Sequence, residues 1–135
     1  MIEAGGSAQR VVLVVEDDRP VGQVLASAIN DEEGYRALHV ETPGDALDVL
    51  KRVHADVLVL DLALPEMSGL ELYDRIRADR RYARVPVVVQ TGHADEHVAE
   101  LRRRGIATYV RKPFDVNLVV DYVKRLAPPL GAATS

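Results

Sequence analysis

The sequence contains no cysteine, and no apolar run approaches the roughly 20 residues that cross a membrane as a helix. Without cysteine the chain can form no disulfide and carries no thiolate chemistry, which fits a cytoplasmic protein. The N-terminus also lacks the charged leader and apolar core of a secretion signal. We therefore expect a cytoplasmic location and no contact with a membrane.

Excess charge of one sign and lysine are also scarce. The formal net charge is -4, which argues against a dedicated nucleic-acid binder, so we expect no direct nucleic-acid binding. Arginine outnumbers lysine by 14 to 3. A lone lysine at the end of a strand is therefore a notable feature.

The length and composition indicate one folded domain. The chain has 135 residues, of which 47% are hydrophobic and 28% are charged, as is ordinary for a globular domain. Residues 1–9, with Gly5-Gly6-Ser7, have the composition of a flexible lead-in. We expect the domain to span residues 10–127, followed by a flexible tail or the start of a linker at 128–135.

Strand and helix patterns alternate five times between these ends. The runs that begin at Val11, Val57 and Val87 are continuously apolar, which is typical of parallel strands covered on both faces. Alternating strands and helices with right-handed crossovers predict a doubly wound α/β fold with a five-stranded parallel sheet.

The helices have recognisable starts and stops. Asp18 precedes the first helix, which we expect to end at Gly34, and Thr42 precedes the second. Ser68 opens a capping box with Glu71 at the third. The remaining predictions are a fourth helix near Asp95–Arg104 that stops at Gly105, a fifth capped by Asp115, and inward apolar stripes that include Val53 in the second helix and Leu118 in the fifth.

Polar side chains follow four of the strand runs. Glu16, Asp17 and Asp18 follow the first run, and Asp61 ends the run that begins at Val57. The other two runs end at Thr91 and at Lys112-Pro113. Since ligands of such sheets bind beyond the carboxyl ends of the strands, we expect carboxylates, a hydroxyl and an ammonium group to converge there.

This set of groups suits phosphoryl transfer with a divalent cation. Asp17 and Asp61 could ligate Mg²⁺ directly, Glu16 through water, and the backbone carbonyl of Ala63 could complete the protein's share. Asp61 is the candidate nucleophile, because a carboxylate can form an acyl phosphate. Lys112 would supply positive charge to the phosphoryl oxygens, and Thr91 a hydroxyl donor.

Plainer roles are open for several of these residues. The acidic run could merely cap the following helix, which we favour for Asp18 but not for Asp17. Thr91 could bond local backbone and Lys112 could be a surface lysine, although their joint placement at strand ends argues against both.

Four motifs in this order resemble the receiver domains of two-component response regulators, the CheY-like fold. The matching segments are Val-Val-Glu16-Asp17-Asp18, Leu60-Asp61-Leu-Ala-Leu-Pro65-Glu-Met-Ser-Gly69, Thr91-Gly-His-Ala-Asp95 and Tyr109-Val-Arg-Lys112-Pro113-Phe114. The resemblance covers about residues 10–127 and implies the strand order 2-1-3-4-5.

The resemblance also implies a signalling function. Asp61 would accept a phosphoryl group from a histidine kinase or histidine phosphotransfer protein, with Mg²⁺ as cofactor. Thr91 and Tyr109 would then move as switch residues and change the face formed by the fourth helix, fifth strand and fifth helix, where phosphorylation could also drive homodimerisation. The domain would be a phosphoacceptor and not an enzyme, and Lys112-Pro113 would be a cis peptide.

The chain departs from the family pattern at four points. Gly92 follows Thr91, Ala63 offers no polar side chain to position a hydrolytic water, and His93 occupies the other position that tunes dephosphorylation. The interval from Thr91 to Lys112 is 21 residues, one fewer than expected. These departures bear on the lifetime of the phosphoryl group and on the fourth helix.

Two other functions were weighed. An aspartate-nucleophile phosphatase usually has an acid two residues after its nucleophile, where this chain has Ala63. A receiver-like adaptor that acts without phosphorylation would not need the complete set of acidic, threonine and lysine positions.

Three further features were weighed as binding sites. His93 and His97 could bind zinc, but no third ligand is evident. The run Arg102-Arg103-Arg104 could contact a partner or nucleic acid, but such a run is more typical of a solvated helix face. Finally, Val21, Pro113 and Phe114 could form an apolar docking patch for the helices of a kinase.

Overall fold

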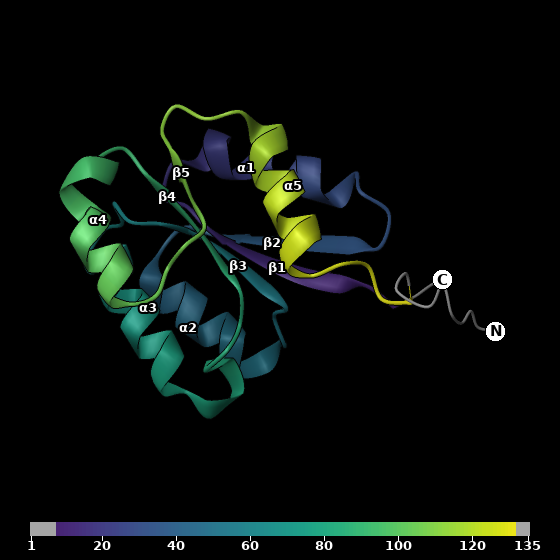
Figure 1. Cartoon of the computed structure of the whole chain (residues 1–135). Helices are drawn as coiled ribbons and strands as arrows, with labels where there is room; N and C mark the ends of the chain where they lie inside the picture. Colours follow the sequence, from purple (N-terminus) through teal and green to yellow (C-terminus); the bar gives the residue numbers. More distant parts are fainter. Residues whose placement is uncertain (1–7, 132–135) are drawn as a thin grey trace.

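The computed structural model describes residues 8–131 and contains one five-stranded parallel sheet flanked by five α-helices (Figure 1). The elements, in chain order, are β1 (Arg10–Val15), α1 (Arg19–Asn30), β2 (Tyr35–Val40), α2 (Pro43–Arg52), β3 (Val57–Asp61), α3 (Gly69–Ala78), the 3-10 helix η2 (Arg80–Tyr82), β4 (Val87–Thr91), α4 (Ala94–Arg103), β5 (Tyr109–Arg111) and α5 (Val116–Leu126).

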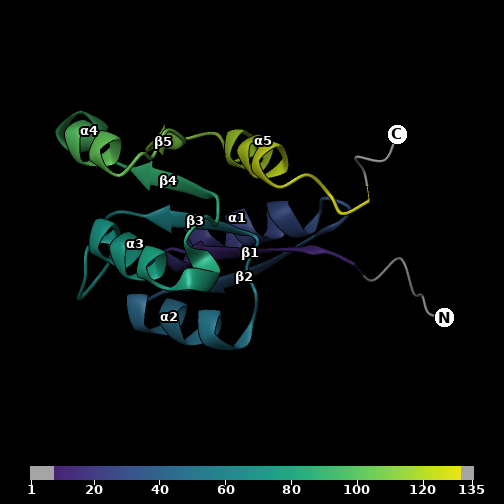
Figure 2. The same ribbon diagram turned by 60° about the horizontal axis from the view of Figure 1, so that its bottom comes forward.

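The strands lie in the order β2-β1-β3-β4-β5, and every pairing is parallel, as predicted. Helices α1 and α5 cover one face of the sheet, while α2, α3 and α4 lie on the other (Figures 1 and 2). From β1 the chain goes to β2 on one side, and it then crosses over to β3 on the other side of β1. The strand order therefore reverses at β1. That reversal opens a crevice beyond the carboxyl ends of β1 and β3, where such sheets bind ligands.

Two apolar cores form because the strands are buried on both faces. Alternate residues of β3 face opposite cores: Leu58 and Leu60 pack with α2 and α3, while Val57 and Val59 pack with α1 and α5. All five residues of β3 and all five of β4 are buried. This explains why these strands show continuous apolar runs with no alternation.

The predicted helix starts are confirmed. The side chains of Asp18, Thr42, Ser68 and Asp115 each accept a hydrogen bond from a backbone N–H in the first turn of α1, α2, α3 and α5. Such caps satisfy amide groups that have no partner inside the helix.

Some predicted helix features differ from the structure. Helix α1 ends at Asn30, with Asp31 as its cap, and Gly34 lies further on, at φ +89°, in the turn that leads to β2. Two residues expected to face inward are exposed: Val53, just past the end of α2, at 37%, and Leu118 in α5 at 41%. The buried positions of α5 are Val119, Val120 and Val123.

Helix α4 forms in the interval that is one residue short. It spans Ala94–Arg103, close to the predicted range, and Gly105 follows it at φ +72°. Arg104 ties the end of α4 to α3, because its guanidinium bonds Asp74 at 2.8 and 2.9 Å and Glu100 at 2.7 Å. The shorter interval therefore still accommodates a regular, anchored helix.

The boundaries of the domain stay a prediction. Most of the expected lead-in and tail lie outside residues 8–131, although Pro128 is described and its carbonyl accepts a hydrogen bond from Arg10 Nε. Within the described part, no helix is long and apolar enough to cross a membrane.

Candidate functional site

Asp61 ends β3 at the crevice and is only 1% exposed. Both of its oxygens are bonded within the protein: Oδ1 accepts the backbone N–H of Ala63 at 3.0 Å, and Oδ2 lies 2.6 Å from Lys112 Nζ. The structure thus holds the Asp61 carboxylate in a defined orientation beside the Lys112 ammonium group.

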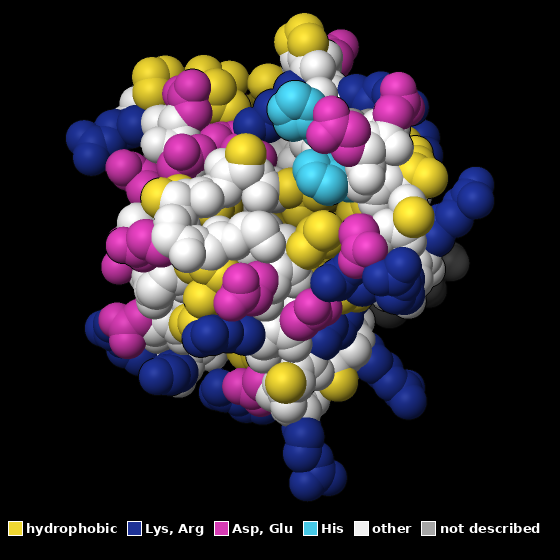
Figure 3. All heavy atoms as spheres, turned by 90° about the vertical axis from the view of Figure 1, so that its left-hand side faces the viewer, with side chains coloured by type: hydrophobic (Ala, Val, Ile, Leu, Met, Phe, Trp, Pro, Cys, Tyr) yellow, Lys and Arg dark blue, Asp and Glu magenta, His cyan; other side chains and the backbone are white. Residues whose placement is uncertain are grey.

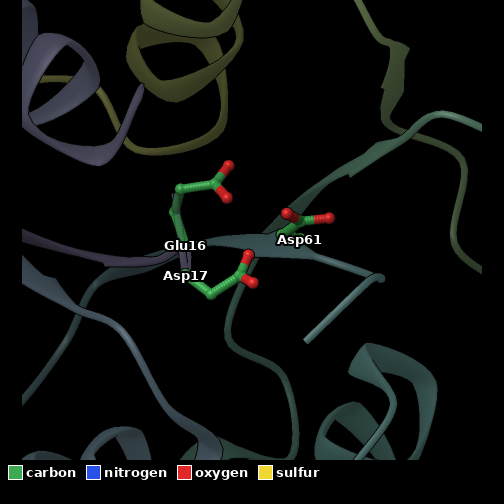
Figure 4. A group of neighbouring side chains, drawn as sticks. All are labelled: Glu16, Asp17 and Asp61. Atoms are coloured by element: carbon green, nitrogen blue, oxygen red, sulfur yellow. The ribbon is translucent and has the colours of Figure 1, made fainter. Parts of the chain in front are cut away.

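Three carboxylates gather around this position. Oxygen atoms of Glu16, Asp17 and Asp61 lie within 4.8 Å of one another, and Figure 4 shows the side chains around one small region at the ends of β1 and β3. Glu16 and Asp61 are buried, whereas Asp17 is exposed. The acidic cluster is therefore open to solvent on one side.

Glu16 is the unusual member of the cluster. It is fully buried, and its Oε2 accepts the Asp18 N–H. Its Oε1 has no hydrogen-bond partner among residues 8–131 and lies 3.7 Å from Lys112 Nζ. Burial, followed by the hydrogen-bonded carboxylate of Asp61, raises the pKa of Glu16 to about 8. A buried carboxylate oxygen without a partner is costly, and a nearby cation would relieve that cost.

The donor set fits a hard divalent cation. Such an ion binds carboxylate oxygens and keeps several water ligands. The cluster offers carboxylate oxygens at the ends of β1 and β3, an unsatisfied Glu16 oxygen, and a side open to water. Ala63, the predicted carbonyl ligand, is exposed and lies directly beside Asp61 through its N–H bond. The structure therefore brings together the three carboxylates predicted to hold the metal, while the Ala63 carbonyl as a ligand stays a prediction. Among residues 8–131 there is no other group of three or more His, Cys, Asp or Glu side chains that could hold a metal ion.

Lys112 enters the crevice from the end of β5. Burial lowers its pKa, but the hydrogen bond and charge of Asp61, together with the charges of Glu16 and Asp17, outweigh burial and raise the pKa of Lys112 above its ordinary value. Its backbone N–H donates to the Thr91 carbonyl at 2.9 Å, and the Lys112-Pro113 peptide is cis, as predicted. The ammonium group is therefore charged and anchored beside the candidate nucleophile.

Thr91 ends β4 and is 2% exposed. Its hydroxyl accepts the His93 backbone N–H at 3.0 Å and lies 3.1 Å from His97 Nδ1. Among the hydrogen bonds of residues 8–131, none joins this hydroxyl to Asp61. The predicted hydroxyl is present at the crevice, but it is bonded within its own loop and α4.

Tyr109 opens β5 and is half-buried, packed against the core on the α2–α4 side. The role of Tyr109 as a switch residue stays a prediction. The three residues expected to form an apolar patch do lie together: Val21, Pro113 and Phe114 line a groove of about 560 Å³ between α1 and the start of α5, and Asp18 and Lys112 line it too. Docking of a kinase there stays a prediction.

The two weaker candidate binding sites, the histidine pair and the arginine run, have structural roles. The rings of His93 and His97 lie 6.4 Å apart, edge to face, and within residues 8–131 they belong to no group of three side chains close enough to hold a metal ion. Arg103 and Arg104 both pair with Glu100, and Arg102 is exposed. The arginine run is thus part of a charged helix face.

Sequence reasoning missed three contacts near the site. The His39 ring covers Gly22, where an added Cβ would lie 2.0 Å from Nε2, and this Nε2 bonds the Glu16 carbonyl at 2.8 Å. Gln90, paired in register with Asp61, is fully buried and its side-chain amide has no hydrogen-bond partner. The third is the bond between Thr91 and His97, for which the six-residue spacing was the only signal.

Comparison with known proteins agrees with this geometry. A sequence model of the response regulator receiver domain matches residues 12–124. Sporulation initiation phosphotransferase F of Bacillus subtilis is 28% identical over 117 residues, covering 87% of this chain and 93% of that protein. The polar-differentiation response regulator DivK of Brucella ovis is 29% identical over 114 residues, covering 84% and 92%.

Solved structures show the same fold. The receiver domain of a sensor histidine kinase from Pseudomonas aeruginosa, with a magnesium ion coordinated in its active site cleft, is 29% identical with a TM-score of 0.74, over 88% of this chain and 98% of that one. Chemotaxis response regulator CheY4 of Vibrio cholerae has a TM-score of 0.80 at 23% identity over 88% and 99%, which supports the fold alone. The chain belongs to the response regulator receiver domains of two-component and phosphorelay systems.

Proposed function

We propose that this domain is a phosphoacceptor switch in which Asp61 receives a phosphoryl group from a histidine kinase or histidine phosphotransfer protein. The observation that carries the proposal is the buried Asp61 carboxylate, oriented by the Ala63 N–H and by Lys112 within an acidic cluster. We expect the transfer to take place in the cytoplasm, in keeping with a cysteine-free chain.

In the proposed step, one oxygen of Asp61 attacks the phosphorus atom of a phosphohistidine. A P–O bond to Asp61 forms as the P–N bond breaks, and the histidine nitrogen keeps the electron pair. Lys112 would balance the charge of the phosphoryl oxygens once the oxygen it now contacts is engaged. Thr91 would donate its hydroxyl to one of them, so the chain mainly supplies position and charge.

Mg²⁺ is the cation we propose for the acidic cluster. Asp17, Asp61 and the Ala63 carbonyl would hold it directly, with Glu16 acting through water. When bound, the ion would neutralise charge on the transferring phosphoryl group. A relative with magnesium in its cleft supports this choice of metal.

We further propose that the domain is not an enzyme acting on a separate substrate. Ala63 lies where a phosphatase with an aspartate nucleophile would carry its second acid, and it has no group to protonate a leaving oxygen. The chain would assist only the phosphorylation and dephosphorylation of its own Asp61.

Phosphorylation would change the α4–β5–α5 face. Thr91 ends β4 and Tyr109 opens β5, and these strands are hydrogen-bonded neighbours. A movement of Thr91 toward the phosphoryl group would therefore also shift Tyr109 and α4. We infer that this face carries the output, including any phosphorylation-driven homodimer.

The apolar groove would receive a helix of the phosphodonor. Lys112, which bonds Asp61, also lines the groove, so a helix seated on Val21 and Phe114 could present its histidine to Asp61. The groove lining is mostly apolar, with Val24 54% exposed at its edge.

The central test uses acetyl phosphate and Mg²⁺ with intact-protein mass spectrometry. The wild-type protein should gain one phosphoryl group on Asp61, and Asp61→Asn should gain none. Asp18→Asn is the matched control, because asparagine can also cap α1 and Asp18 lies outside the acidic cluster. Equal labelling of Asp61→Asn would overturn the proposal, and no labelling of the wild type would favour an adaptor that acts without phosphorylation.

A further inference from the structure

The hydroxyl of Thr91 is bonded on the α4 side of its loop. His93, the residue at the start of α4, donates its backbone N–H to this oxygen at 3.0 Å, and His97 Nδ1, one turn further along α4, lies at 3.1 Å. Thr91 is 2% exposed, so water has little access to replace either bond. Figure 3 shows two histidine side chains side by side on this face of the molecule, next to acidic side chains.

These bonds compete with the role proposed for Thr91. A threonine hydroxyl has one proton to donate. If Nδ1 of His97 is unprotonated it receives that proton, and if it is protonated it fills an acceptor site of the oxygen. In the first case the hydroxyl must leave His97 before it can donate to a phosphoryl group on Asp61. In the second case its proton is free, but the bonded oxygen is held on the α4 side, and no hydrogen bond among residues 8–131 joins it to Asp61.

We propose that His97 is a positioning residue that holds the Thr91 hydroxyl in the unphosphorylated arrangement and so sets how readily the domain switches. This inference rests on the proposed phosphoacceptor role of Asp61. His97 contacts no reacting atom; it acts only through Thr91. The domain has two arrangements, and the bond to His97 exists in one of them.

The hydrogen bond between Thr91 and His97 determines how far the equilibrium between the two arrangements is shifted. Its net contribution corresponds to a change of about two- to tenfold in an equilibrium between two arrangements. A ligand that binds only the released arrangement has its apparent affinity reduced by the fraction of molecules in that arrangement. Removing the bond should therefore strengthen binding of a phosphoryl mimic by this factor.

The test compares His97→Leu with His97→Asn, since an asparagine amide can occupy the place of Nδ1 while leucine cannot bond. Beryllofluoride with Mg²⁺ serves as the phosphoryl mimic, and backbone amide signals near Asp61 report saturation by NMR. We expect half-saturation of His97→Leu at a concentration about two- to tenfold lower than for the wild type. His97→Asn should resemble the wild type, and Asp61→Asn should not bind.

A second measurement detects the bond without any phosphoryl mimic. The ¹⁵N signals of the His97 ring should move in Thr91→Val, which lacks the hydroxyl, and should move likewise in the wild type when beryllofluoride saturates it. Equal half-saturation of His97→Leu and the wild type, or ring signals unaffected by Thr91→Val, would overturn the inference. If the wild type fails to bind beryllofluoride, the phosphoacceptor proposal itself fails and the role of His97 in switching falls with it. The ring signals in Thr91→Val would still show whether the bond exists.

Discussion

Glu16 shows at the scale of one residue how the site depends on a cation. Its side chain is fully buried, one oxygen lacks a hydrogen bond, and the positive charge of Lys112 is shared with Asp61. A buried carboxylate in this position is more easily tolerated when protonated, which is why its pKa rises to about 8. A cation held at the acidic cluster would balance the charge of the ionised form.

We predict that, without divalent cations, stability falls as the pH rises from about 5 to about 8. The Glu16 carboxyl ionises near its ordinary pKa of 4.5 in the unfolded chain and near about 8 in the folded one, so the folded state binds its proton more tightly in this range. The favourable contribution is complete below 4.5 and is lost as the pH approaches 8. Urea unfolding should show a decrease of a few kcal/mol, since each pKa unit corresponds to about 1.4 kcal/mol.

Glu16→Gln provides the control for this prediction. The glutamine variant has no carboxyl to titrate and should show a much flatter pH profile over the same range. Adding Mg²⁺ at pH 8 should restore stability to the wild type, because binding to the folded state alone stabilises it. A wild-type profile that is flat, or that rises with pH, would contradict this account of Glu16.

At the scale of elements, α1 and the start of α5 form the groove proposed to receive the phosphodonor. We predict that Val24→Glu lowers phosphotransfer from a histidine-phosphorylated phosphotransfer domain at least about tenfold, because a charge would lie on the apolar contact. Labelling by acetyl phosphate should be unchanged, since Val24 is 54% exposed and is not a member of the acidic cluster. Time courses of ³²P transfer measure both reactions.

Leu118→Glu is the matched control for the groove. Leu118 is also an exposed apolar helix residue, at 41%, but it lies in α5 outside the groove lining. Its substitution should leave both reactions unchanged. An equal loss in the two variants would assign the effect to charge on the surface in general, and no loss in Val24→Glu would place the donor elsewhere.

Helix starts could be predicted from the sequence because a cap is a contact between near neighbours. Ser68, for example, accepts the N–H of Glu71, three residues away. Helix ends and inward faces depend on distant packing: Leu118 fits the helical spacing, yet the sheet buries Val119 and Val120 instead. The 3-10 helix η2 was not anticipated, since it is held by bonds from the Tyr82 hydroxyl to the carbonyls of Leu50 and Val53.

The site could be predicted to the extent that parallel topology determines it. Asp17, Asp61, Thr91 and Lys112 converge because parallel strands end at one edge of the sheet. The partners of each group could not be predicted in the same way. That Thr91 bonds His97 and not Asp61 is decided by the path of the loop and by side-chain rotamers, which spacing in the sequence does not specify.

At the scale of the whole molecule, the site and the segment 127–131 after α5 lie at opposite ends of the strands. The segment that follows α5 returns to the starts of β1 and β2 (Figures 1 and 2), where the Tyr35 hydroxyl bonds the Ala127 carbonyl at 2.6 Å and Arg10 bonds Pro128. Lys124 of α5 also pairs with Glu32 at 2.7 Å. These contacts stabilise the end of the sheet where β1 and β2 start, and they involve none of the residues proposed to switch.

We therefore predict a localised response when beryllofluoride and Mg²⁺ bind. Hydrogen–deuterium exchange should change in residues 91–111, because release of the Thr91 hydroxyl removes an acceptor from the His93 N–H at the start of α4, and because β4 and β5 are paired. Exchange at the Tyr35 and Ala127 amides should stay constant, since these N–H groups bond the carbonyls of Glu32 and Val123, which are not among the residues proposed to switch. Asp61→Asn under the same conditions should show neither change. Equal changes at both ends of the strands would instead indicate a response of the whole fold, and an unchanged 91–111 segment would exclude the α4–β5–α5 face as the output.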